Sequence, residues 1–71
     1  MDVKNGMAYL EPADHDLWKK LLGRDIPVKI PVLLLRELGE HRIREFQEDG
    51  CKEKAMLCTE HVSKLPERLL H

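Results

Sequence analysis

The segment DIPVKIP, residues 25–31, lies between two stretches with helical patterns and decides how the chain is organised. A proline fixes its own φ angle and keeps the preceding residue out of the helical region, so Ile26 and Ile30 are biased towards extended backbone. Apolar residues here also alternate with Pro27 and Lys29, which is the two-residue period of a strand. We therefore expect an extended segment, which Pro27 limits to the edge of a sheet or to a two-stranded ribbon.

Three stretches around this segment have helical patterns. Residues 12–22 begin with a proline, which suits a first helical turn, and stop before Gly23. Residues 31–50 and 51–65 carry apolar residues at steps of three and four, which gathers them on one face of each helix. Gly39 falls within the apolar face of the middle stretch, although a glycine in a helix costs about 1 kcal/mol relative to alanine. We expect it to allow the close approach of another helix.

The fold class that follows is mainly α: a small three-helix domain with the short extended segment between the first and second helices. We expect a single domain over residues 11–71, with Pro66 ending the third helix and an extra turn over 67–71. Residues 1–10 show no sustained period and contain the turn signal Asn5-Gly6, which predicts a flexible arm.

The small size of the chain points to association with a second chain. A chain of 71 residues buries little more than half of the surface that it exposes when unfolded. Two apolar helical stripes exceed what a lone chain of this length can readily cover, so we expect a dimer. Within one chain the expected helix contacts join Leu35, Leu38, Ile43 and Phe46 to Ala55, Cys58, Val62 and Leu65. The residues expected at the partner interface are Leu33, Leu34, Met56 and Leu57.

The charge balance limits nucleic-acid binding to a local basic patch, and the hydropathy argues against a membrane partner. Twelve basic and thirteen acidic residues give a net charge of −1, so the chain lacks the broad positive field of sequence-independent phosphate binding. No stretch approaches the roughly 18 apolar residues of a membrane span, and the polar start MDVKNG lacks the apolar region of a signal peptide. We therefore expect a cytoplasmic protein that has no membrane partner.

Cys51, Cys58 and His61 are the only group of soft metal ligands, and they share one face of the third helix. Cysteines seven residues apart on a helix are separated by about 10 Å, which is too far for a disulfide. Zinc sites usually contain a C-x2-C pair, and that spacing is absent. We expect buried apolar cysteines and no metal. Zinc binding with a ligand from His15, His41 or a second chain is an alternative.

Catalytic motifs are lacking as well. Cys58 and His61 have the spacing of a thiolate and a base, but no third residue is placed to orient them. His41 and Glu45, one turn apart, are expected to form a solvated pair. The sequence contains no HExxH, P-loop, GxSxG or dinucleotide-binding motif. We expect no enzymatic activity and no cofactor.

The run Val28–Pro31, followed by Leu34, Leu35 and Leu38, resembles the transition from strand to helix in ribbon-helix-helix DNA-binding proteins. The resemblance covers about residues 26–65. It implies a dimer in which each chain contributes one strand to a ribbon, and outward strand side chains that enter the major groove of DNA.

Under this resemblance the nucleic-acid contacts would come from a small basic cluster. Lys29 is the only basic residue that would point outwards from the strand, and Lys20 and Arg24 lie shortly before it. A dimeric DNA-binding transcriptional regulator is therefore the alternative function. The leading hypothesis is a small non-enzymatic regulatory or adaptor protein that acts through protein–protein interaction and self-associates.

Overall fold

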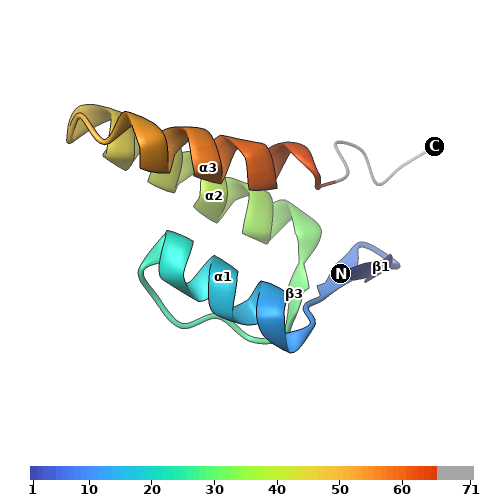
Figure 1. The fold of residues 1–71 in the computed structure, drawn as a ribbon. Helices are drawn as coiled ribbons and strands as arrows, with labels where there is room; N and C mark the ends of the chain where they lie inside the picture. Colours follow the sequence, from blue (N-terminus) through green and yellow to red (C-terminus); the bar gives the residue numbers. More distant parts are fainter. Residues whose placement is uncertain (66–71) are drawn as a thin grey trace.

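The computed structural model describes residues 1–65 and contains three helices and a small three-stranded antiparallel sheet (Figure 1). The mainly helical class and the three helices are as predicted, whereas the prediction of one extended segment misses two of the three strands. The extra turn expected over residues 67–71 lies outside the described residues. In chain order the elements are β1 (Asp2–Lys4), β2 (Met7–Tyr9), α1 (Pro12–Leu22), β3 (Lys29–Pro31), α2 (Val32–Glu48) and α3 (Lys52–Ser63).

The N-terminal residues form a β-hairpin where the sequence suggested a flexible arm. β1 and β2 pair with Lys4 opposite Met7 and with only Asn5 and Gly6 between the strands. Asn5 has φ 50° and Gly6 has φ 77°, and positive φ at both central residues is the geometry of a type I′ turn. Asn-Gly favours this turn because both residues tolerate positive φ. Strands of three residues are too short to show a period, which explains why the sequence pattern did not predict them.

The extended segment predicted between the first two helices contains β3, which is shorter than the prediction. It lies at one edge of the sheet, where it pairs with β2 and places Ile30 opposite Ala8. The pairing continues beyond the strand, because the N–H of Leu10 donates to the carbonyl of Val28 at 2.8 Å. The N–H of Val32 likewise donates to the carbonyl of Gly6 at 2.9 Å. The edge position agrees with the restriction that Pro27 imposes.

α2 and α3 form an antiparallel hairpin that crosses closely at Gly39, as predicted. The chain reverses at Gly50, whose φ of 76° suits the end of a helix, and the N–H of Cys51 donates to the carbonyl of Phe46 at 2.8 Å. A methyl group at Gly39 would overlap the Val62 side chain of α3. Glycine therefore leaves room on α2 for the Val62 side chain at this crossing.

α1 and the sheet lie on one side of the α2–α3 hairpin (Figure 1). Trp18 of α1 is buried and approaches both Gly39 and the ring of His61. Arg42 of α2 contacts the C-terminal end of α1, because its Nε donates a hydrogen bond to the carbonyl of Leu21 at 3.0 Å. No helix within residues 1–65 is long and apolar enough to cross a membrane.

One core joins all of these elements. It contains residues of the sheet, of each helix and of the connections between them. Most of both helical stripes is covered within one chain, because α1 and the sheet pack against the helix hairpin. The expectation that a lone chain can hardly cover these stripes is therefore wrong for most of their residues, and the dimer stays a prediction. The buried members are Ala8, Leu10, Trp18, Leu22, Ile26, Ile30, Val32, Leu35, Phe46, Ala55, Cys58, Val62 and Leu65.

Candidate protein-interaction surface

Large apolar side chains remain exposed next to the buried stripes. Met56 has the highest exposed fraction, 72%, and Leu33 follows among the helical residues with 54%. Each lies one position along the helix from a buried residue, so it points roughly 100° away from the core. The large apolar side chains exposed among residues 1–65 are Met1, Tyr9, Val28, Leu33, Leu34, Met56 and Leu57. All four residues predicted for the partner interface belong to this set.

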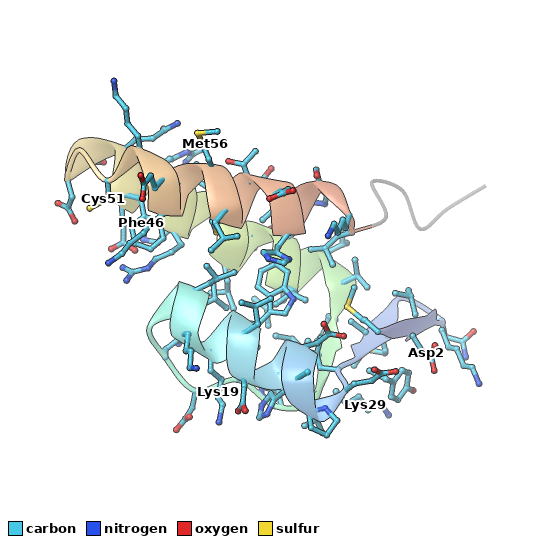
Figure 2. The ribbon with its side chains drawn as sticks, in the orientation of Figure 1. Asp2, Lys19, Lys29, Phe46, Cys51 and Met56 are labelled. Atoms are coloured by element: carbon cyan, nitrogen blue, oxygen red, sulfur yellow. The ribbon has the colours of Figure 1, made fainter. Side chains whose placement is uncertain are left out.

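Met56 lies in a shallow hollow of about 630 Å³ on the outer side of α3. Figure 2 shows its side chain pointing away from α1. Ala55, Met56 and Leu57 provide the apolar part of this hollow, and Glu53 and Glu60 are the charged residues that line it. Gln47 of α2 and Thr59 complete the lining. We call this set of seven residues the Met56 hollow.

Leu33 lies on the same side of the helix hairpin as Met56. Residues seven apart on a helix differ by only about 20° in direction, so Leu33 falls in one row with Glu40 and Gln47. Gln47 lines the Met56 hollow. This side faces away from α1, and α1 and the sheet leave it uncovered (Figure 1).

Leu34 and Leu57 lie closer to α1. Leu34 belongs to the helical row that continues through Leu38 to Arg42, whose guanidinium contacts α1. Leu57 lines a second hollow of about 270 Å³, to which α1 contributes Leu17 and Leu21. The structure therefore divides the four predicted interface residues between two sides of the hairpin.

Two residues at the rim of the Met56 hollow were missed by the sequence analysis. Glu53, Met56 and Glu60 follow one another at steps of three and four, which places all three on one face of a helix. This spacing is visible in the sequence. The apolar periodicity that predicts the helices does not include these acidic residues.

The residues proposed for nucleic-acid contact lie elsewhere, and two of the three, Lys20 and Arg24, lie beside acidic residues. The Nζ of Lys29 lies 5.6 Å from the centre of the Tyr9 ring in the same sheet. Lys20 and Arg24 line a hollow that also contains Asp16 and Asp25. The strand that would form a two-chain ribbon in the ribbon-helix-helix resemblance is paired on one edge with β2 of its own chain.

The cysteine and histidine side chains of α3 are engaged in packing. Cys58 is fully buried, and its Sγ donates a weak hydrogen bond to the carbonyl of Gly39 at 3.5 Å. Burial raises the pKa of the Cys58 thiol, and the nearby Arg42 opposes this effect. The His61 ring meets Trp18 edge-on at 6.2 Å between ring centres. Among residues 1–65, no group of three or more histidine, cysteine or acidic side chains is placed to hold a metal ion.

The two free thiols should differ strongly in reactivity. Cys51 is partly exposed, whereas Cys58 is buried and its raised pKa leaves less thiolate at any given pH. We expect iodoacetamide to modify Cys51 of the native protein first, and Cys58 at least about tenfold more slowly. Mass spectrometry of timed samples measures both rates. In denaturant the two rates should become similar, and equal rates in the native protein would contradict the burial of Cys58.

Comparisons with protein-family models, with curated proteins and with solved structures each found no match to this chain.

Proposed function

We propose that this protein is a small non-enzymatic interaction domain that acts as a regulator or adaptor by binding another protein. Its contact surface is the side of the α2–α3 hairpin that faces away from α1. The Met56 hollow forms one end of this surface, and Leu33 lies at the other end.

The exposure of Met56 is the observation that carries this proposal. Its side chain is 72% exposed although the chain buries its neighbours Ala55 and Cys58. Covering a methionine side chain gains about 1.5–3 kcal/mol, which is a substantial part of a typical binding free energy. Methionine also adapts its shape to a partner because it is unbranched and flexible.

The non-enzymatic part of the proposal is supported by how Cys58 and His61 are used. A nucleophilic cysteine needs an accessible thiolate, whereas Cys58 lies in the core with a raised pKa. His61 packs against Trp18. Both side chains thus contribute to the contact between α1, α2 and α3.

A second copy of the chain is a second candidate for the partner. Cys58 lies level with Gly39, and the helices are antiparallel, so Met56 lies level with His41 of α2. Leu33 is eight residues before His41, which places it roughly 12 Å from Met56 along the hairpin. A two-fold axis between them would place Leu33 of one copy on Met56 of the other, and Met56 on Leu33. Self-association would follow from this arrangement.

Light scattering during size-exclusion chromatography tests the surface. Met56→Glu should abolish association in which this surface takes part, because it would bury an unpaired charge. Val28→Glu is the matched control, since Val28 is 55% exposed but lies beside the sheet. Circular dichroism of both variants should match that of the unmodified protein. An oligomer that survives Met56→Glu and Leu33→Glu would show that this surface does not mediate self-association.

A further inference from the structure

We propose that the partner of the Met56 hollow is a basic amphipathic helix that presents an apolar side chain flanked by lysine or arginine. This inference rests on the proposed function and specifies the chemistry of the partner. It is carried by the charges around Met56 and by their spacing along α3.

The charged residues that line the hollow are both acidic. Glu53 and Glu60 are exposed, and within residues 1–65 neither carboxylate forms an ion pair. Lys52, one turn before Met56, is not among the residues that line the hollow, so the two carboxylates give the hollow itself a negative potential around its apolar contact point. A complementary ligand therefore carries positive charge on both sides of an apolar group.

The spacing of these residues fits a helical partner. Glu53 and Glu60 are seven residues apart, so their positions differ by about 10.5 Å along α3, and Met56 lies between them. A helix that lies along α3 presents residues seven apart with the same separation. Its basic residues would meet the two carboxylates while an apolar residue between them contacts Met56, as flanking charges do in paired helices.

The same charges disfavour a second copy of this chain as the occupant. In the two-fold pairing described above, Glu40 and Glu60 of each copy lie between Leu33 and Met56, near the axis. Like charges that face one another across an interface oppose association. Arg44 lies seven residues, or roughly 10 Å, along the hairpin from this axis, so it offsets little of this repulsion.

The test uses two synthetic helical peptides with identical apolar faces. One carries lysine pairs seven residues apart beside the apolar face, and the other carries glutamate at the same positions. Binding to the full chain is measured by fluorescence anisotropy of labelled peptide. We expect the lysine peptide to bind at least about tenfold more tightly than the glutamate peptide, with an advantage that falls as salt is added.

Variants of the protein show whether the lysine peptide binds at the Met56 hollow or only through the net charge of the chain. Glu60→Lys should weaken binding of the lysine peptide several-fold and strengthen binding of the glutamate peptide. Asp25→Lys changes the net charge of the chain equally but lies outside the hollow, so it should leave both affinities nearly unchanged. Met56→Ala should weaken binding of both peptides, because both share the apolar contact.

The outcomes distinguish this inference from the proposed function. Equal binding of both peptides, or equal effects of Glu60→Lys and Asp25→Lys, would overturn the basic partner. If neither peptide binds but Met56→Glu converts a dimer to a monomer, the surface binds a second copy of the chain. The inference of a basic helical partner is then wrong. If neither peptide binds and the chain is monomeric at every concentration, both the inference and the proposed surface fail.

Discussion

Leu35→Ala should remove about 3–5 kcal/mol from the free energy of unfolding. Leu35 is completely buried in the first turn of α2, where it belongs to the core shared with the sheet and the other helices. A domain of this size has a free energy of unfolding of about 4–10 kcal/mol, so the variant should lose a third or more of its stability. Chemical denaturation followed by Trp18 fluorescence measures the change.

The neighbouring leucine provides a matched control. Leu34 lies in the same helix but is 44% exposed, so Leu34→Ala removes the same atoms from a site that is only partly buried. Alanine also favours helix slightly more than leucine. We expect a loss below about 1 kcal/mol. Similar losses for the two variants would contradict the orientation of α2.

Gly39→Ala should destabilise the protein by about 1–3 kcal/mol although alanine is the better helix former. The added methyl group would overlap the Cγ2 atom of Val62, and a ring carbon of Trp18 lies at 3.5 Å from the same position. Relief would require the Val62 side chain of α3 to shift, while the Trp18 contact stays at an ordinary van der Waals distance. Thermal unfolding followed by circular dichroism measures the loss.

A double-mutant cycle identifies the cause of this loss. Val62→Ala destabilises the protein on its own by leaving space beside Gly39, and the methyl group of Gly39→Ala occupies part of that space. The double variant should therefore be more stable than the sum of the single effects predicts, by about 1 kcal/mol. Gly50→Ala is the control: its strain comes from φ 76° with no atom nearby, so its effect should add to that of Val62→Ala. Additivity at Gly39 would contradict the close crossing.

The helices could be predicted from the sequence because each has a repeated signal. In α2 and α3 the apolar residues recur at steps of three and four over three or more turns. In α1 a proline begins the helix and a glycine ends it. The sheet has no such signal. Its strands contain three residues each, and their pairing joins Tyr9 to Lys29 across twenty positions of the chain. Asn5-Gly6 indicated a turn but not what the turn connects.

The candidate site was predictable only in part for a related reason. Leu33 and Met56 were identified because they are apolar residues outside the stripes, and the structure exposes both. Leu33 and Met56 lie on a different side of the hairpin from Leu34 and Leu57, and this difference depends on where α1 packs. The position of α1, fixed in part by the hydrogen bond from Arg42 to the carbonyl of Leu21, cannot be read from the sequence. The extent of intrachain burial was misjudged because the contribution of β1 and β2 to the core was unknown.

The short sheet also affects how the chain behaves when many copies are present. β1 and β3 are its two edge strands, and each is three residues long. The unpaired edge of β3 includes Pro31, which has no N–H to donate. The unpaired edge of β1 exposes the backbone of Val3, which lies between the charged residues Asp2 and Lys4. Edge strands that are short, charged or contain proline pair poorly with a strand from another chain. The fold should therefore resist growth into fibrils, and its recognition of other molecules is left to the helices.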